Sequence, residues 1–293
     1  MNYEGILTAM VTPLTKDNLV DEKKLVDLIE FQLSNGITGL LMGGGTGEYA
    51  AVAPAERAKA VKIAKEAAAG RVPVIAGVLD PGLGDSIHAA QLYKKAGADS
   101  LLLLTPFYVS PSQEGIYDYF KKLDEAVDMP FMIYNIPYRT MINITPDTVE
   151  RMADTMPNLC GMKECSPNLG QAIDLLNRVG DRIAVLSGEE FLCAGEVLMG
   201  AKGGIIATAN VIPDVWVRIY EAAKNARMEE VRTLMKQYFP FFQVMFREPN
   251  PGPIKYAMKK IGKDPGVLST PLREPGEALQ KEIDAELKKI GLL

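Results

Sequence analysis

Eight short apolar runs, separated by segments of helical character, constrain the fold of this chain more than any other feature of its sequence. Most of the runs are apolar along their whole length and do not alternate with polar residues, which is typical of parallel strands buried on both faces. The sequence therefore predicts a parallel sheet covered by helices. The predicted strands are 6–11, 37–42, 72–78, 100–104, 130–134, 159–163, 183–186 and 204–207.

The segments between these runs carry recognisable helix ends. Asp21 precedes one helical pattern that closes at Gly36, and Pro54 begins another that stops at Gly70. The sequence at 145–147, Thr-Pro-Asp, predicts an N-cap, a proline in the first turn and an acid near the positive helix end. Eight strands that alternate with helices predict an α/β fold, the (β/α)₈ or TIM barrel.

The chain of 293 residues continues for more than 80 residues after the eighth run, which is too long for a closing helix alone. Helical periods at 213–226, 228–242, 253–261 and 275–290 predict a C-terminal helical extension packed on the barrel. We therefore expect one structural unit, with the barrel in 1–224 and the extension in 225–293.

Composition excludes several classes of protein. The net charge of −5 arises from 32 basic and 37 acidic residues that are well mixed, so no nucleic-acid footprint is expected. Cys160, Cys165 and Cys193 form an odd set without metal-ligand spacing, and His88 is the single histidine. No export signal and no apolar run of about 18 residues is present. These features predict a cytoplasmic protein with reduced thiols, no metal and no membrane contact.

Lys163 is the first candidate for chemistry, because it ends the predicted strand 159–163. The carboxyl ends of barrel strands form the face where active sites lie. Partial desolvation there is expected to lower the pKa of the ammonium and to make the amine a nucleophile toward a ketone. The alternative is a structural ion pair with Glu164 or Glu189.

Polar groups follow two other predicted strands. The loop that contains Gly45 and Thr46 is rich in glycine, so its N–H groups can form a nest for a carboxylate or phosphate, although a flexible turn is the alternative. Tyr134 ends the strand next to that of Lys163 and can move protons, and Arg139 offers a charged fork for a carboxylate. Packing and solvation are the corresponding alternatives for these two side chains.

Taken together, these motifs resemble the dihydrodipicolinate synthase and N-acetylneuraminate lyase family of class I pyruvate aldolases. The resemblance extends over essentially the whole chain. It includes GILTAMVTP at 5–13, the GGTGE loop, TPFY, YNIPYRT, GMKE, SGE at 187–189 and GGIIATAN at 203–210.

The resemblance implies that Lys163 forms a Schiff base with pyruvate or a related 2-keto acid, whose carboxylate is held by Gly45 and Thr46. It also implies that Tyr134 relays protons, and that Tyr108 enters the active site of a neighbouring subunit in a homotetramer built from tight dimers. Because the imine is the electron sink, no cofactor is expected. Two further positions follow from the resemblance: Ile205 lines the pyruvate pocket, and Gly188 lies with Glu189 at its rim.

The second substrate is a separate question. Arg139 favours condensation of pyruvate with L-aspartate 4-semialdehyde, because synthases of this family hold the aldehyde's carboxylate with such an arginine. Gly45 stands where the synthases and lyases carry Ser or Thr, and the segments 77–81 and 249–255 also differ from those of the synthases. The alternatives are a 2-keto-3-deoxy sugar acid aldolase or dehydratase, an enzyme like N-acetylneuraminate lyase, and a non-catalytic barrel that binds carboxylates.

Regulation by lysine is expected to be weak or absent. Synthases of this family can be inhibited by lysine at a dimer interface. Tyr49, Ala53 and Arg57 in the corresponding region do not resemble the version of that site that contains histidine.

Overall fold

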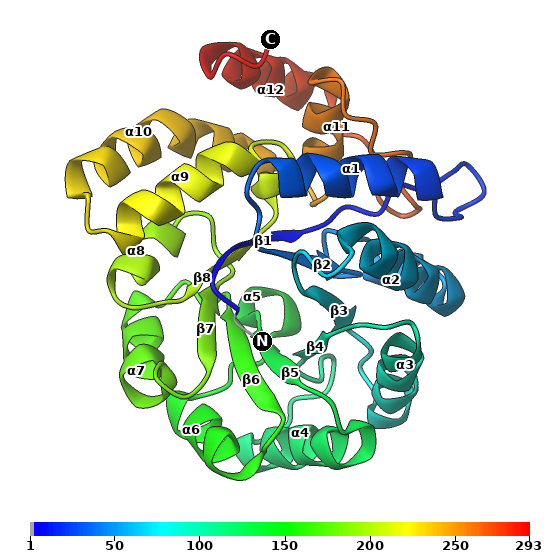
Figure 1. Cartoon of the computed structure of the whole chain (residues 1–293), viewed down its shortest axis with the longest axis vertical. Coiled ribbons are helices and arrows are strands. Elements are labelled where there is room, and N and C mark those ends of the chain that lie inside the picture. Colours follow the sequence, from blue (N-terminus) through cyan, green and yellow to red (C-terminus); the bar gives the residue numbers. More distant parts are fainter. Residues whose placement is uncertain (1–2) are drawn as a thin grey trace.

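The computed structural model describes residues 3–293, in which eight parallel strands close into a barrel in chain order (Figure 1). Nearly every strand residue is buried, as expected for strands covered on both faces. All eight predicted strands are confirmed, with ends that shift by at most two residues because a strand is counted only where its neighbours pair with it. The strands are β1 (Gly5–Ala9), β2 (Gly39–Met42), β3 (Val74–Val78), β4 (Ser100–Leu104), β5 (Phe131–Asn135), β6 (Leu159–Glu164), β7 (Ala184–Ser187) and β8 (Gly203–Ile206).

Helices surround this barrel, and most of them begin where the sequence predicts (Figure 1). The Asp21 carboxylate accepts a hydrogen bond from the N–H of Lys24 at 3.2 Å and caps the first helix. Thr145 occupies the N-cap position of α6, but its side chain makes no capping bond and contacts Gln113 and Thr148 instead. The helices in this part are α1 (Glu22–Ser34), α2 (Pro54–Ala68), α3 (Leu83–Lys95), α4 (Gln113–Val127), α5 (Pro137–Thr140), α6 (Pro146–Thr155), α7 (Leu169–Val179) and α8 (Cys193–Leu198), with the short 3₁₀ helices η1 (Tyr49–Ala51) and η2 (Thr208–Asn210).

The C-terminal part is helical and lies on one side of the barrel, where α10 packs against α9, and α12 packs against α10 and α11 (Figure 1). Helix α10 lies along α9, where the rings of Trp216 and Phe242 stack with their centres 4.9 Å apart. After α11 the chain returns to the barrel, and Val267 donates a backbone hydrogen bond to the carbonyl of Leu14 at 2.9 Å. These helices are α9 (Pro213–Lys224), α10 (Met228–Met245), α11 (Gly252–Lys260) and α12 (Glu277–Lys289).

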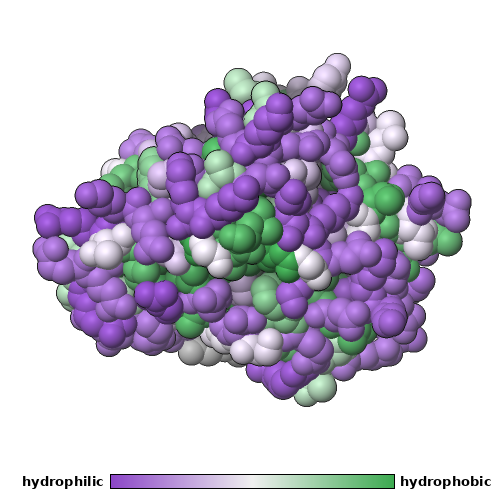
Figure 2. Space-filling view, turned by 90° about the horizontal axis from the view of Figure 1, so that it is seen from above, coloured by the Kyte–Doolittle hydropathy of each residue, from purple (hydrophilic) through white to green (hydrophobic). Residues whose placement is uncertain are grey.

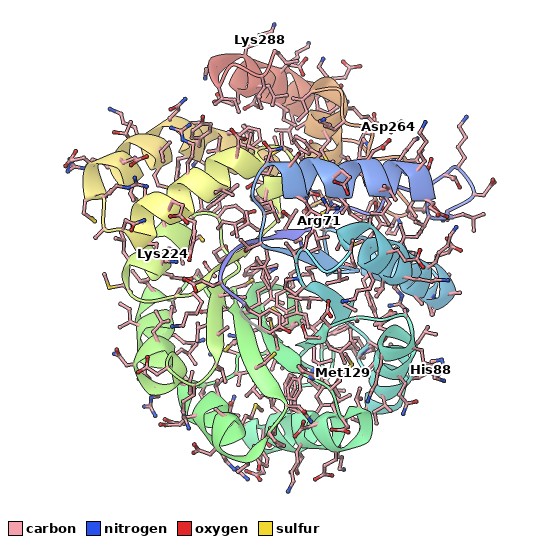
Figure 3. All side chains as sticks on the ribbon, in the orientation of Figure 1. Arg71, His88, Met129, Lys224, Asp264 and Lys288 are labelled. Carbon is pink, nitrogen blue, oxygen red and sulfur yellow. The ribbon has the colours of Figure 1, made fainter. Side chains whose placement is uncertain are left out.

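The surface of the protein carries mainly polar side chains (Figure 2). The face in Figure 2 is mostly hydrophilic, with apolar residues gathered near its middle. His88 lies on the outer side of α3, well away from the centre of the barrel (Figure 3). Within residues 3–293, no helix is long and apolar enough to cross a membrane, and no cluster of His, Cys, Asp and Glu is arranged to hold a metal ion.

Candidate active site

A cavity of about 480 Å³ opens at the carboxyl ends of the barrel strands. Its wall contains seven of the eight residues that the sequence singles out as catalytic or substrate-binding, which come from β2, β5, β6, β7, β8 and the loops that follow them. Residues 246–250, between α10 and α11, close the cavity from the C-terminal extension. The seven predicted residues are Gly45, Thr46, Tyr134, Arg139, Lys163, Gly188 and Ile205.

Lys163 and Tyr134 face each other across neighbouring strands. They are register partners in the pairing of β5 with β6, and Lys163 Nζ lies 4.7 Å from the centre of the Tyr134 ring. Each side chain is only 6% exposed. Burial raises the pKa of Tyr134 to about 12, so this phenol holds its proton at neutral pH and can lend it to a nearby atom. A proton donor and an amine thus share one enclosed site.

The pKa of Lys163 differs from the prediction. Burial lowers it, but Tyr134, Cys165 and the acidic Glu190 and Glu189 raise it more, and the net result lies above the ordinary value of a lysine. The expected lowering of this pKa is therefore wrong, because the sequence could not place these electron-rich groups around the ammonium. The free amine has to be generated within the site.

Glu164 is not the partner of Lys163. Successive residues of a strand point to opposite faces, so the Glu164 side chain lies on the outer side of β6. There it accepts hydrogen bonds from Asn135 at 2.9 Å, from the N–H of Ser166 at 2.6 Å and from Gln171 at 3.1 Å. Among residues 3–293, neither Glu164 nor Glu189 forms an ion pair with Lys163 Nζ within 4.0 Å, although the Glu189 charge contributes to its raised pKa.

Gly188 is required by the position of the Lys163 side chain. A Cβ atom at this residue would lie 2.6 Å from Lys163 Cε and 2.0 Å from Cys165 Sγ, and real Cβ atoms do not approach so closely. The main chain after β7 can therefore pass beside the lysine stem only as glycine. The N–H of Gly188 donates to the carbonyl of Glu164 at 2.7 Å, which fixes this crossing.

The loop after β2 presents unpaired donors to the cavity. Within the part of the chain that the structure describes, no hydrogen bond uses the N–H group of Gly45 or Thr46. The Thr46 hydroxyl is buried in the same wall and accepts a hydrogen bond of 2.9 Å from Asn250 Nδ2. Such a cluster of N–H and O–H groups suits an anion, as the glycine-rich sequence predicts.

Arg139 and Tyr138 belong to the short helix α5 at the rim. Arg139 lies beside Gly45 and borders both the main cavity and an adjacent hollow of about 340 Å³. The hydroxyl of Tyr138 donates to Glu189 Oε1 at 2.7 Å across the mouth. Burial raises the pKa of Glu189 to about 7, whereas the hydrogen bond from Tyr138 opposes that rise.

Tyr138, Glu190 and Asn250 are site residues that the sequence reasoning missed. Glu190 Oε1 accepts from the N–H groups of Ala207 at 2.9 Å and Thr208 at 3.0 Å, so it holds the chain after β8. Burial raises its pKa. The sequence does contain a signal for Glu190, because this residue is a second acid directly after the motif SGE at 187–189. Nothing in the local sequence places Asn250 beside a loop that lies 204 residues earlier.

Tyr108 does not reach the cavity of its own subunit. It is 98% exposed and has a left-handed backbone with φ of 73°, which is unusual for a residue with a side chain. Val109 beside it is also exposed. The expected entry of Tyr108 into a neighbouring active site therefore stays a prediction.

Comparison with known proteins gives one consistent result. The model of the "Dihydrodipicolinate synthetase family" matches residues 2–290. The 4-hydroxy-tetrahydrodipicolinate synthase of Maridesulfovibrio salexigens is 36% identical over 293 residues, with 100% of both chains covered. The dihydrodipicolinate synthase of Aquifex aeolicus is 33% identical with a TM-score of 0.95, and the alignment covers 99% of each chain.

A third relative is similar over an equal length. The crystal structure of the chloride-inhibited dihydrodipicolinate synthase of Acinetobacter baumannii, complexed with pyruvate, has a TM-score of 0.95 and 31% identity, with 100% of both chains covered. The similarity in fold and sequence thus extends over the barrel and the C-terminal helices, and this chain belongs to the dihydrodipicolinate synthetase family.

Proposed function

We propose that this protein is a Schiff-base-forming lyase that condenses pyruvate with L-aspartate 4-semialdehyde, the activity of a 4-hydroxy-tetrahydrodipicolinate synthase. The observation that carries the proposal is the position of Lys163. Its amine is buried at the floor of the cavity beside the Tyr134 phenol, with Nζ 4.7 Å from the ring centre. The activity named for the relatives from Maridesulfovibrio salexigens and other bacteria supports the choice.

In the first half-reaction, the free amine of Lys163 attacks the ketone carbon of pyruvate. The C–N bond forms as the carbonyl oxygen takes a proton from Tyr134. The nitrogen then returns a proton to the phenolate, which passes it to the new hydroxyl, and loss of water leaves a protonated imine. Removal of a proton from the methyl carbon gives an enamine. The unpaired N–H groups of Gly45 and Thr46 and the Thr46 hydroxyl hold the carboxylate of pyruvate in this scheme.

In the second half-reaction, the enamine carbon attacks the aldehyde carbon, which restores the imine, and the new alkoxide takes a proton from Tyr134. Attack of the substrate's own amine on the imine carbon then closes a ring and releases the Lys163 amine. Arg139 at the rim holds the carboxylate of the aldehyde substrate, because a guanidinium matches a carboxylate with two parallel hydrogen bonds. Glu189 lies at the opposite side of the mouth, where it bonds to Tyr138. Its negative charge suits the ammonium group of L-aspartate 4-semialdehyde.

The quaternary arrangement belongs to the same proposal. Tyr108 from a neighbouring subunit enters the active site, and the protein is a homotetramer of two tight dimers. The full exposure of Tyr108 and the hollow of about 340 Å³ beside Gly45, Leu104 and Phe107 support an incoming aromatic side chain. Sedimentation of Tyr108→Asp, which should dissociate the tight dimer, checks this arrangement.

Borohydride reduction in the presence of pyruvate tests the chemistry. The intact protein should gain one reduced pyruvate per chain by mass spectrometry, and peptide mapping should place it on Lys163. The Lys163→Arg variant should gain none, while Lys259→Arg, which changes an exposed lysine paired with Glu274, should still be labelled. Absence of an adduct on the unaltered protein would refute the proposal.

A second candidate, cleavage or dehydration of a 2-keto-3-deoxy sugar acid, is favoured by Gly45, because a glycine supplies no hydroxyl to the wall of the cavity. Both candidates predict the pyruvate adduct on Lys163. Turnover of L-aspartate 4-semialdehyde and of 2-keto-3-deoxy acids, measured side by side, distinguishes them. Good cleavage of a sugar acid with negligible condensation would reverse the order of the two.

A further inference from the structure

The segment 246–255 of the C-terminal extension contacts the loop after β2 at Thr46 and at Glu48. The first contact joins Asn250 Nδ2 to Thr46 Oγ1 at 2.9 Å. In this orientation of the Asn250 amide the hydroxyl oxygen accepts the hydrogen bond, so the hydroxyl proton of Thr46 remains available for another acceptor. Asn250 Oδ1 is buried and has no hydrogen-bond partner among the described residues. Both residues line the cavity, so that acceptor can be a bound substrate.

The second contact is a buried ion pair. Lys255 Nζ lies 2.5 Å from Glu48 Oε1, and the two side chains are almost completely buried. Lys255 also donates to the carbonyls of Thr12 at 2.8 Å and Val267 at 2.7 Å. Glu48 Oε2 accepts from the N–H of Ser269 at 2.7 Å. The pair therefore joins the loops after β1 and β2 to α11 and to the segment that follows it.

Glu48 needs such an anchor because its backbone is left-handed, with φ of 58°. This conformation is unfavourable for a residue that has a Cβ atom, and it persists only where the surroundings impose it. The residues just before Glu48 are mainly glycines, which have wide conformational freedom when nothing holds them. A loop with this composition would otherwise lose much entropy each time it ordered around an anion.

We infer that Asn250 and Lys255 are positioning residues for the keto-acid carboxylate: Asn250 directs the Thr46 hydroxyl proton into the cavity, and Lys255 holds the loop through Glu48. The inference rests on the proposed function, in which Thr46 and Gly45 bind that carboxylate. The donors are thus fixed before the substrate arrives, which reduces the ordering required on binding. The C-terminal extension acts on the substrate through the loop and does not touch the reacting carbon.

A double-mutant cycle tests the role of Asn250. The concentration of pyruvate that gives half-maximal borohydride labelling is measured for the unaltered protein, Asn250→Ala, Thr46→Val and the double variant. Asn250→Ala should raise it by about three- to tenfold and leave kcat within about twofold, and Thr46→Val should raise it by about tenfold. The double variant should be no worse than Thr46→Val alone. Independent, multiplying effects would overturn the inference.

Asn250→Asp sharpens the same test, because its carboxylate can only accept a hydrogen bond and takes the Thr46 proton away from the cavity. It should weaken pyruvate binding more than Asn250→Ala does. In the Thr46→Val background the remaining effect of Asp reports charge repulsion alone. If that remainder equals the whole effect, orientation of the hydroxyl plays no part.

A charge-free pair tests Lys255. Lys255→Met alone leaves Glu48 buried and unpaired, and this variant is expected to fold poorly. Glu48→Gln with Lys255→Met removes both charges and should fold, with weaker pyruvate labelling by about fivefold or more. Lys259 lies on the same helix as Lys255 and forms an exposed ion pair with Glu274. Lys259→Met is therefore the matched control, and it should change neither folding nor pyruvate labelling. A folded double variant that binds pyruvate normally would contradict the inference.

These outcomes remain separable from the proposed function. If the unaltered protein forms no adduct with pyruvate, the proposed function fails first. If it forms the adduct on Lys163 and the Asn250 and Lys255 variants require no more pyruvate than it does, the function stands and only the positioning role is lost.

Discussion

The Nη1 atom of Arg139 lies 3.3 Å from the position that a Cβ atom would take at Gly45. The guanidinium thus occupies space that a larger residue at 45 would need. The backbone of Gly45 is not in the left-handed region, so a side chain here is opposed only by the arginine tip, which would have to shift by a few tenths of an ångström. Because Gly45 has no side chain, it supplies no hydroxyl, and the Arg139 guanidinium can lie close to the Thr46 loop.

Gly45→Ala should disturb the arginine and little else. The new methyl group displaces the guanidinium by a few tenths of an ångström, so we expect KM for L-aspartate 4-semialdehyde to rise by about tenfold, with KM for pyruvate unchanged. Steady-state kinetics with each substrate varied in turn measures both. Gly84→Ala is the matched control, because a Cβ there meets no atom within 4 Å. A rise confined to KM for pyruvate would show that Arg139 serves the other carboxylate.

The pH dependence of the second half-reaction should follow Glu189, whose pKa is about 7. Glu189→Gln should remove an inflection near pH 7 from the profile of kcat/KM for the aldehyde. The hydrogen bond from Tyr138 lowers the pKa of Glu189, so Tyr138→Phe should move the inflection to higher pH by about half to one unit.

The control for this profile is Tyr117→Phe, which removes a tyrosine hydroxyl bonded to Thr155 on the outer helices. It should leave the inflection in place. A shift to lower pH in Tyr138→Phe would mean that the hydroxyl stabilises the protonated form of Glu189.

Stability should fall as the pH rises through neutrality, because burial raises the pKa of Glu196 from 4.5 to about 7. The folded state then binds this proton more tightly than the unfolded state, and the resulting stability is fully present below about pH 4.5 and lost as the pH passes about 7. Glu196→Gln stays neutral and should be more stable than the parent by about 2–3 kcal/mol at pH 8.

Urea unfolding at pH 5 and pH 8 measures this effect, and the advantage of Glu196→Gln should be much smaller at pH 5. The exposed Glu66, which pairs weakly with Lys62, provides Glu66→Gln as a control with no such dependence. Parallel stability curves for the parent and Glu196→Gln would mean that the Glu196 carboxyl has the same pKa in both states.

L-lysine at millimolar concentration should leave the rate of condensation unchanged. The Arg57 guanidinium lies 3.6 Å from the centre of the Tyr49 ring and 4.0 Å from Asp80 Oδ1, so a cation already occupies the aromatic face and the carboxylate that the ammonium group of a lysine would contact. An initial-rate assay with and without lysine is sufficient. Strong inhibition would contradict the prediction.

The sequence predicts most of the barrel because its signals are local. Apolar runs identify strands, and the register that pairs Tyr134 with Lys163 follows once neighbouring strands end at the same face. The pKa of Lys163 was predicted with the wrong sign because it depends on groups from β5 and from the turn after β7. Asn250 was missed for a similar reason, since its contact with Thr46 spans 204 residues. Contacts between residues that are far apart in the sequence produce no local sequence pattern, so they could not be predicted.

The ion pair of Glu48 and Lys255 also bears on the order of synthesis. A ribosome completes all eight strands long before it reaches Lys255 and Ser269, the two residues that hold Glu48. A nascent chain that already contains Lys163 and Tyr134 therefore lacks the restraint on its anion loop. The restraint on this loop thus depends on a part of the chain that forms no strand of the barrel, and truncation before Lys255 would remove it while leaving all eight strands in place.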